Sequence, residues 1–567
     1  MQQSRAPRVS LVILIATVSA MRVASTVAAD SAPVLPSVKS RSTRLDTERP
    51  PEVPDDAALE ASGARIGEIL FKPLQLFDIG GLDQDSALFR LGNRLHIRTR
   101  DDTIADQLLF HQGQPYNASA VAESARILRS TRYLRDASIR PIAYHDGVVD
   151  LEVTTQDVWT LNPGISFGRH GGQNTGGFDL EELNFLGLGT QLGVGFKSGI
   201  DRDSKSVFYR DHQLGSSWWD LSTTYSDNSD GRLADFSLER PFYSLETQRA
   251  GGVSFSDDLR VDSRYDLGKV IDKFETHAKL ASAYWGFSKG LSNDWAHRYS
   301  LGFTYDDHEF NDAPGVAPSV ALPADRQLVY PWVAAEWVQD RFATTRNRDQ
   351  IEKTEDYSLG WKLRAQVGFA SSSLGSDRDA IMLEGTASTG YDLTERQSLI
   401  LSAAASGRFE DGDLDNGLLG AEARYYFRQS KRRLFFMGLS ATSGTRLDSD
   451  TQILLGGDNG LRGYPLRYQA GTGRWLFTAE QRVYTNWFPF QLFNVGGAVF
   501  FDMGRVTGRD PLASESQGLL KDVGIGLRLG NSRSALGNVL HIDLAFPLDG
   551  DASIDKVQVV VETKRSF

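Results

Sequence analysis

The chain contains no cysteine, which excludes disulfide bonds and thiolate-ligated metals. Its nine histidines are scattered, and no two of them stand at the spacing of metal ligands, so the sequence predicts neither a metal site nor a cofactor. Basic residues are in the minority, because 61 Lys and Arg face 73 Asp and Glu. The resulting net charge of -12 argues against a nucleic-acid partner.

Long hydrophobic runs are also missing beyond the N-terminus, where no stretch approaches the roughly 20 apolar residues of a membrane-spanning helix. The one apolar run, from Val9 to Ala20, follows Arg5 and Arg8 and precedes the small residues Val27-Ala28-Ala29. This layout predicts a signal peptide over residues 1–29; an N-terminal membrane anchor is the alternative, for which the run is short. A secreted chain without membrane helices is either soluble or crosses a membrane as a β-barrel.

Signatures of catalysis are absent as well. The sequence shows no Ser-His-Asp order, no P-loop and no metal cluster. Gly524-Ile525-Gly526 falls within a strand-like segment and not before a helix, so it does not read as a phosphate-binding loop. We therefore expect that the protein is not an enzyme.

At 567 residues the chain is too long for one ordinary soluble core. Residues 30–62 are rich in proline, serine and charge, which predicts a disordered linker. Residues 63–156 show a small α/β pattern. In chain order it predicts a strand over 65–77, a helix over 101–110, a helix from the N-cap Asn117 to Leu134, and a hairpin around Asp146-Gly147. This β-α-α-β-β order resembles a single polypeptide-transport-associated (POTRA) domain.

From residue 157 to residue 567, short alternating segments replace the helical periodicity. One strand is predicted over residues 357–369, with an apolar face along its whole length and a second face that is charged in mid-strand. A soluble β-sandwich also buries an apolar face, but an apolar face backed by mid-strand charge is typical of a strand between lipid and water. Residues 475–487 repeat the pattern, with Trp475 and Trp487 at the ends, where an aromatic girdle sits. We therefore expect an all-β transmembrane β-barrel over residues 157–567.

The last predicted strand ends on an aromatic residue, Phe567. Its apolar face is made of Val557, Val559, Val561, Thr563, Arg565 and Phe567. A terminal aromatic resembles the C-terminal signal by which outer-membrane proteins are recognised for insertion, although Arg565 stands where an apolar residue is usual. Phe567 is therefore the predicted assembly signal.

A glycine-rich loop with a central arginine, Arg462, precedes two strand-like segments that contain Glu480 and Asp502. Glycine permits positive φ and a close backbone approach, so the loop can fold tightly against a neighbour. Alternation places both carboxylates on the lumen face of adjacent strands, about 4.8 Å apart. Two such acids predict a bidentate contact with Arg462; the alternative is a solvated arginine with two unrelated acids.

The residues around this arginine resemble the outer-membrane assembly superfamily, also called the bacterial surface antigen family. It includes BamA- and TamA-type insertases and two-partner-secretion transporters. The resemblance rests on Gly460-Leu461-Arg462-Gly463-Tyr464, on Glu480-Gln481-Arg482, on Phe501-Asp502-Met503-Gly504 and on the early turn over residues 181–189. It implies that Arg462 is the loop arginine, that Glu480 and Asp502 are its barrel-wall partners, and that the loop over residues 450–474 folds inward.

The size of the barrel is left open. The resemblance implies sixteen strands, eleven before the loop and five after it, whereas the alternating segments number about fifteen before it and five after it. Hairpins around residues 206–225 and 418–440 look additional. Both totals are even and place the loop on the same side, so parity does not choose between sixteen and about 20. The chain also departs from the best-known members in having one POTRA-like domain.

Three functions compete. The first is an outer-membrane protein assembly, insertion or translocation factor, which receives unfolded outer-membrane or secreted proteins through a periplasmic POTRA domain. It would act through a barrel seam or through the lumen; Gly164, Gly168, Gly171 and Gly172 near the first strand weaken the pairing of that strand at the seam. The second is a dedicated secretion pore for one partner protein, and the third is a lipid-transport or structural barrel. The expected location is the bacterial outer membrane, with its lipid bilayer and possible accessory periplasmic proteins as partners.

Overall fold

The computed structural model describes residue 45 and residues 48–74, 96–315, 320–351, 353–489, 493–531 and 539–564. The predicted signal peptide, residues 30–44 of the predicted linker and the predicted assembly signal Phe567 lie outside this part of the chain. In the part that is described, no helix has the length and apolar character needed to cross a membrane.

A small α/β domain comes first in the chain. Its elements are β1 (Arg65–Leu74), α3 (Asp101–Ala105), α4 (Ala118–Ser130), β2 (Leu134–His145) and β3 (Val148–Asp157). The sheet order is β1-β3-β2, with β3 parallel to β1 and antiparallel to β2. The Asn117 side chain caps α4 by accepting a hydrogen bond from the Ala120 amide at 2.9 Å. The β-α-α-β-β order predicted from the sequence is confirmed.

This domain begins before residue 63, where the sequence predicted a disordered linker. Helix α1 (Asp56–Ala61) lies within that segment and is capped by Asp55. Its Leu59 is fully buried and packs in the domain core with Leu128 and Val149. A helix of 6 residues with one buried apolar side chain leaves no periodic pattern, so composition alone suggested disorder there.

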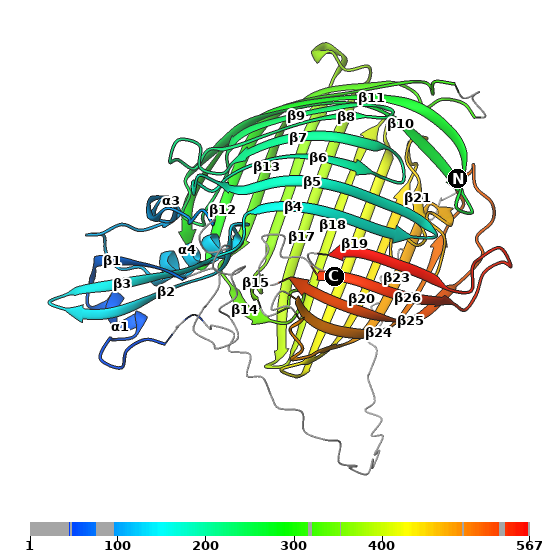
Figure 1. The fold of residues 1–567 in the computed structure, drawn as a ribbon. Helices are drawn as coiled ribbons and strands as arrows, with labels where there is room; N and C mark the ends of the chain where they lie inside the picture. The colour runs from blue at the N-terminus through cyan, green and yellow to red at the C-terminus, as the bar shows by residue number, and fades with distance from the viewer. Residues whose placement is uncertain are drawn as a thin grey trace, which may run out of the picture. The chain divides into compact units, whose positions relative to one another are not determined.

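In the described residues, twenty strands close into one barrel that follows the small domain (Figure 1). In chain order they are β4 (Leu161–His170), β5 (Gln173–Phe185), β6 (Thr190–Ser198), β7 (Asp203–Asp211), β8 (Asp220–Asn228), β9 (Gly231–Arg240), β10 (Arg249–Asp266), β11 (Lys269–Ser292), β12 (Trp295–Asp312), β13 (Arg326–Gln339), β16 (Lys362–Ala370), β17 (Ala380–Thr394), β18 (Gln397–Glu410), β19 (Asp413–Ser430), β20 (Arg433–Thr445), β23 (Gly473–Tyr484), β24 (Phe493–Thr507), β25 (Leu520–Asn531), β26 (Val539–Pro547) and β27 (Gln558–Lys564). Neighbouring strands are antiparallel throughout. Fifteen strands precede Arg462 and five follow it, as the alternating segments predicted; the sixteen strands that the resemblance implied are too few.

One predicted strand is wrong. Residues 357–369 do not form a single strand, because the barrel strand β16 begins only at Lys362. The preceding β15 (Thr354–Ser358) pairs instead with β14 (Phe342–Arg346) in a separate two-stranded sheet. The break falls at Leu359 and Gly360, whose amides both donate to the Arg341 carbonyl, at 2.7 and 2.9 Å.

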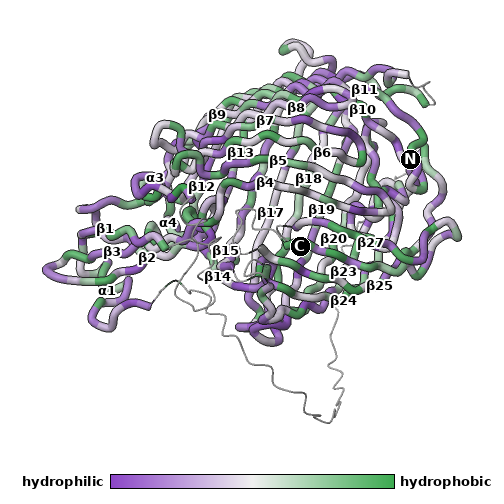
Figure 2. Tube along the Cα trace, in the orientation of Figure 1, coloured by the Kyte–Doolittle hydropathy of each residue, from purple (hydrophilic) through white to green (hydrophobic). Residues whose placement is uncertain are grey.

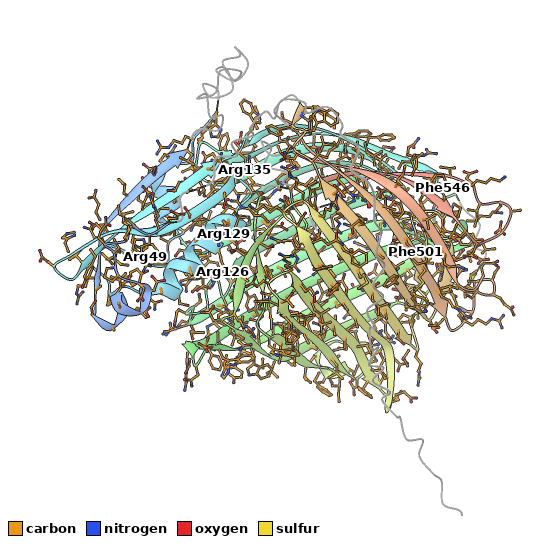
Figure 3. The ribbon with its side chains drawn as sticks, turned by 90° about the horizontal axis from the view of Figure 1, so that it is seen from below. Arg49, Arg126, Arg129, Arg135, Phe501 and Phe546 are labelled. Atoms are coloured by element: carbon orange, nitrogen blue, oxygen red, sulfur yellow. The ribbon has the colours of Figure 1, made fainter. Side chains whose placement is uncertain are left out.

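The outer surface of the barrel is apolar in alternate positions, as the sequence predicted. Along β25, Val523, Ile525 and Leu527 are exposed, whereas Asp522 and Arg528, which flank them, are buried. Figure 2 shows the same alternation of hydrophobic and hydrophilic residues along the barrel strands. Figure 3 labels Phe501 and Phe546 on β24 and β26, in the strand positions that face outward. Lipid outside and a polar lumen inside account for this pattern.

The two ends of the barrel are distinguished by their loops. The turn between β5 and β6 contacts the small domain: the Gly187 carbonyl accepts hydrogen bonds from the Arg100 amide at 3.1 Å and from the Thr103 hydroxyl at 2.9 Å. Asn184 donates to Thr99 Oγ1 at 2.8 Å in the same contact. We call this end of the barrel the domain end and the opposite one the far end. Fifteen strands separate the domain-end start of β4 from the loop that holds Arg462, so that loop starts at the far end.

The first and last strands meet in a weak seam. In the described residues a single pair, Val561 with Arg169, joins β27 to β4. By contrast, β26 pairs with β27 continuously from Val539–Lys564 to Ala545–Gln558. The barrel is therefore closed, but most of the backbone hydrogen-bonding groups along its seam are not held by the facing strand.

Candidate functional site

The loop that connects β20 to β23 contains the site. It forms a short antiparallel pair of its own, β21 (Ile453–Leu455) with β22 (Gln469–Gly471), and carries Arg462 between them. Four side chains of the loop are buried with residues of the barrel wall in one apolar cluster. The cluster comprises Leu455, Leu461, Tyr464, Tyr468, Val506 and Leu520. Burial of these side chains holds the loop inside the barrel, where the sequence predicted it over residues 450–474.

Two glycines let the loop approach the wall closely. Gly460 has a φ of 119°, a conformation that other residues rarely adopt, and a Cβ there would overlap the side chain of Leu476. A Cβ at Gly463 would lie 2.7 Å from Cβ of Asp522 and 3.1 Å from the Pro547 amide nitrogen. The Gly463 amide uses this closeness to donate to Asp522 Oδ2 at 3.1 Å. The two glycines predicted as part of the loop motif are therefore required by space, and Gly460 also by backbone conformation.

The guanidinium of Arg462 contacts both carboxylates that the sequence predicted. Its Nε and Nη2 donate to the two oxygens of Asp502 at 2.7 and 3.0 Å, which is the bidentate geometry expected of an arginine. Its Nη1 donates to Glu480 Oε2 at 3.1 Å and to Asp543 Oδ2 at 3.0 Å. Asp543, on β26, is a third wall partner that the sequence reasoning missed.

Register explains how two strands present these acids to one cation. Glu480 on β23 lies opposite Phe500 on β24, and Asp502 lies opposite Thr478, so the two acids are diagonal neighbours on the lumen face. Phe500 stands between them, and the carbon at the centre of the Arg462 guanidinium lies 3.3 Å from the centre of its ring. The face of the Phe500 ring therefore packs against the flat side of the guanidinium, and the acids accept hydrogen bonds at its edges.

Two further arginines complete the group. Arg482 donates to Glu480 Oε1 at 3.0 Å, and Arg528 donates to Glu480 Oε2 at 3.2 Å and is ion-paired with Asp543. We call the six charged residues the Arg462 cluster: Arg462, Arg482, Arg528, Glu480, Asp502 and Asp543. Their side chains are at most 7% exposed. Three cations face three anions, so the charges of the cluster balance, and this balance makes their burial tolerable.

The start of the loop is tied to the far-end rim by more ion pairs. Arg408 makes two hydrogen bonds with Asp448, both at 2.7 Å, and Arg326 donates to Asp450 at 2.9 Å. Arg264 donates to the Ser449 carbonyl at 3.1 Å. The loop is thus held at its rim by charged contacts and at its tip by the Arg462 cluster.

The end of the loop has a similar anchor. Arg467 makes two hydrogen bonds with Asp201, both at 2.6 Å, and its guanidinium lies 4.3 Å from the ring centre of Tyr265. Next to it, a Cβ at Gly171 would lie 2.8 Å from the Pro465 carbonyl carbon. Gly171 is at the tip of the β4–β5 hairpin, so the loop packs directly on the first strand pair of the seam.

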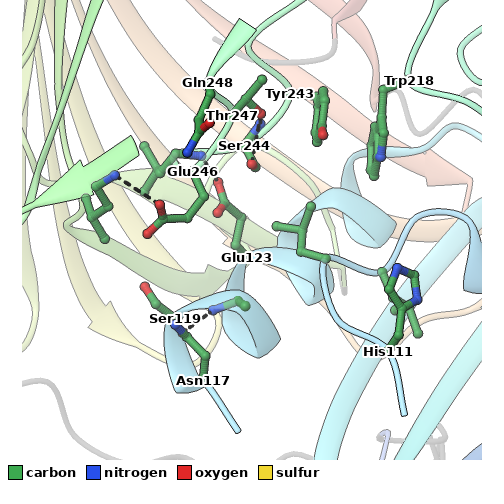
Figure 4. A pocket seen from close by; sticks show the side chains of 15 residues that line it. His111, Asn117, Ser119, Glu123, Trp218, Tyr243, Ser244, Glu246, Thr247 and Gln248 are labelled. Atoms are coloured by element: carbon green, nitrogen blue, oxygen red, sulfur yellow. Dashed lines mark hydrogen bonds between the residues drawn. The ribbon is translucent and has the colours of Figure 1, made fainter. Parts of the chain in front are cut away.

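Beside the Arg462 cluster lies a cavity of about 300 Å³. Glu422 of β19 and Glu562 and Lys564 of the last strand line it, together with Arg462 and Glu480. A second cleft, of about 380 Å³, lies between α4 of the small domain and the barrel turn over residues 243–248 (Figure 4). Across that cleft the amide of Leu245 donates to Glu123 at 3.0 Å. Among the described residues, no group of three or more His, Asp or Glu side chains is arranged to hold a metal ion.

A twenty-strand antiparallel barrel with an alternating apolar surface and an arginine loop pinned in its lumen defines a transmembrane β-barrel of the loop-plugged kind. The sequence profile of the Omp85 superfamily domain matches residues 184–562, and the chain belongs to this superfamily. Its location is consistent with a bacterial outer membrane.

The chain is also similar to several solved structures. The chain is similar to BamA from Haemophilus ducreyi lacking POTRA domains 1–3, at 15% identity and a TM-score of 0.38, over 88% of this chain and 85% of that one. It is similar to CdiB from Acinetobacter baumannii at 13% identity and a TM-score of 0.43, over 88% and 73% of the two chains. CdiB from Escherichia coli gives 13% identity and a TM-score of 0.46, over 88% and 76%. No curated protein matches the chain in sequence.

Proposed function

We propose that the protein assembles or translocates other proteins at the bacterial outer membrane, and that it acts through the seam between β27 and β4. The observation that carries this proposal is that, in the described residues, Val561–Arg169 is the single pair in that seam. A strand edge whose backbone groups are not paired is a template on which an incoming strand can form hydrogen bonds. Separation of this one residue pair would expose two such strand edges and would cost little free energy.

The small domain would lie in the periplasm and receive the client. Its β2 is an edge strand that pairs only with β3 in the described residues, so an extended client segment can add to the sheet there. The contact between Gly187 and Arg100 supports this assignment, because it holds the domain at one end of the barrel, which would then be the periplasmic end. The filled lumen supports the seam as the route, because a dedicated secretion pore would first have to displace the Arg462 cluster.

Depletion of the protein, followed by proteomics of the outer membrane and of the secreted fraction, tests the proposal. A broad loss of barrel proteins is the expected result for an assembly factor. Loss of one secreted protein would instead identify a dedicated transporter that uses the lumen. No change in either fraction would contradict both and would favour a lipid-transport or structural barrel.

Removal of the small domain should separate insertion from client handling. A variant that lacks residues 48–157 keeps every barrel strand, so we expect it to reach the membrane and to retain the heat-resistant mobility of a folded barrel on electrophoresis. Client assembly should be lost, because the receiving sheet is gone. Full client assembly by this variant, at equal amounts in the membrane, would rule out a receiving role for the domain.

A further inference from the structure

Between β13 and β16 the chain leaves the barrel wall and returns to it. We call residues 340–361 the hairpin insert. Its strands β14 and β15 pair with each other from Phe342–Ser358 to Arg346–Thr354, and β13 pairs directly with β16 behind them. The barrel wall is therefore complete without the insert, so the insert is not needed to close the barrel. Both strands lie at the domain end of the barrel (Figure 1).

The tip of the hairpin insert is inside the lumen. Ile351 is buried among side chains of β19, β20, β23 and β26 that face inward, namely Tyr426, Leu434, Phe436, Tyr484 and Val539. A Cβ at Gly530 of β25 would lie 3.0 Å from Cβ of Ile351. The tip thus crosses from the β13–β16 side of the wall to the strands on either side of the arginine loop.

There the tip binds the Arg462 cluster. Arg482 donates to the carbonyl oxygen of Arg348 at 2.9 Å and lies 3.9 Å from a carboxylate oxygen of Asp349. The guanidinium of Arg348 itself lies 3.9 Å from the ring centre of Tyr426. Since Arg482 also donates to Glu480, one side chain joins the hairpin insert to the carboxylate that holds Arg462.

The tip has a rigid internal geometry. The carboxylate of Glu355, on β15, accepts hydrogen bonds from the amides of Arg348 and Asp349, both at 2.9 Å. Burial, followed by the nearby charge of Asp349, raises the pKa of Glu355 to about 7. A turn tied to β15 in this way moves with β15, so displacement of the base of the insert carries the tip with it.

The base of the hairpin insert binds the small domain. Arg129 of α4 donates to both oxygens of Asp356, at 2.7 and 2.5 Å. Asp136, on β2, accepts from Arg346 at 3.1 Å and from the Thr354 hydroxyl at 2.8 Å. The guanidinium of Arg126 lies 4.2 Å from the ring centre of Phe342. Figure 3 labels Arg126 and Arg129 together on α4, beside the barrel.

We infer that the hairpin insert couples the position of the small domain to the Arg462 cluster. Movement of α4 draws β14 and β15 with it, withdraws the tip from Arg482 and removes a restraint on the carboxylate that binds Arg462. The two ends of the insert are each held by charged hydrogen bonds, so the element has one arrangement in which both contacts are made and another in which both are lost. This coupling rests on the proposed function only in assigning a client as the cause of the movement.

Hydrogen exchange of the purified full-length protein in detergent, without any client, tests the coupling. Arg129→Ala should speed backbone exchange about tenfold or more in residues 347–351, because it removes two charged hydrogen bonds at the base. The same variant should speed exchange in residues 456–468 of the arginine loop. Faster exchange in the hairpin insert with an unchanged loop would overturn the inference, and so would no change in either segment.

Arg132→Ala is the matched control, because Arg132 forms an ion pair with Glu181 of the barrel wall, 3.4 Å away. It should leave exchange in residues 456–468 as in the unmodified protein; an equal effect would show that any loss of domain contact loosens the loop. If Arg129→Ala does not fold, Asp356→Asn provides the same test with a smaller change in shape.

A disulfide at the tip provides the complementary test. The chain has no cysteine of its own, so Ile351→Cys with Gly530→Cys can form only one crosslink. Their Cβ positions lie 3.0 Å apart, so a disulfide, which holds its Cβ atoms roughly 3.8 Å apart, requires the two backbones to separate slightly. Oxidation should suppress the effect of Arg129→Ala on residues 456–468, and reduction should restore it. Fast loop exchange in the oxidised double-cysteine variant would show that the signal bypasses the hairpin insert. Because no client is present, failure here leaves the proposed function untouched.

Discussion

Replacing Arg462 with alanine should abolish client assembly while the barrel stays folded. Truncating one member of a buried ion pair costs about 3–5 kcal/mol, because the partner charge is left buried without compensation. Glu480 and Asp543 keep Arg482 and Arg528 as partners, but Asp502 has Arg462 as its ion-pair partner in the described residues. We expect the loop over residues 456–468 to leave the lumen and become sensitive to trypsin. Electrophoretic mobility without heating should show the folded barrel.

A second substitution distinguishes the loss of the Arg462 contacts from the effect of a buried carboxylate that has lost its cation. Asp502→Asn, added to Arg462→Ala, removes the carboxylate that would otherwise be stranded, so the double variant should be more stable than Arg462→Ala alone. Arg462→Lys should restore little, since a lysine cannot make the bidentate contact with Asp502 and the contact with Glu480 together. Full client assembly and a protease-resistant loop in Arg462→Ala would contradict the role assigned to the cluster.

Locking the seam should stop client assembly just as completely. Arg169→Cys with Val561→Cys places two thiols at the residue pair that joins β27 to β4 in the part of the chain that the structure describes. If clients are templated on separated seam strands, the oxidised variant should be inactive, and a reductant should return its activity. Activity is measured as the amount of newly synthesised barrel protein that becomes heat-modifiable in the membrane.

The control for this experiment is a disulfide between strands that are already fully paired. Ala403→Cys with Ala421→Cys joins β18 to β19 at a pair in the middle of their ladder. It adds the same covalent bond without closing the seam, so activity should persist when it is oxidised. Equal loss of activity in both variants would point to a general effect of crosslinking, and full activity of the seam variant would exclude opening at β27 and β4.

Much of the wall and half of the site follow from alternation alone. A strand between lipid and a polar lumen must alternate, and this rule placed Glu480 and Asp502 on the lumen face of adjacent strands. It also gave fifteen strands before the loop and five after it. Asp543 obeys the same rule: on β26 it faces the lumen, as His541 does, whereas Leu544 faces outward. A lone acid outside any motif gave no reason to select it.

The hairpin insert was hidden by the same rule. Tyr357 and Leu359 keep the parity of Trp361 and Leu363, so the period-2 pattern runs across a break in the chain. In the structure Tyr357 lies under the guanidinium of Arg348 at 4.6 Å, and Leu359 is buried. An alternating pattern shows that one face of a segment is apolar, but it does not show what that face packs against. A hairpin packed inside a lumen needs apolar residues as much as a strand that faces lipid does.

The wall partners of Arg462 have a consequence for how the chain folds. They lie 18, 40 and 81 residues further along the sequence, on β23, β24 and β26, and in the described residues the cluster draws no carboxylate from the first fifteen barrel strands. Contacts of short sequence separation form early, because little loop entropy is lost in closing them. The C-terminal strands and the arginine loop can therefore fold as a nucleus. The barrel strands from β4 to β20 would add to it afterwards, and the seam would be the last junction of the barrel to close.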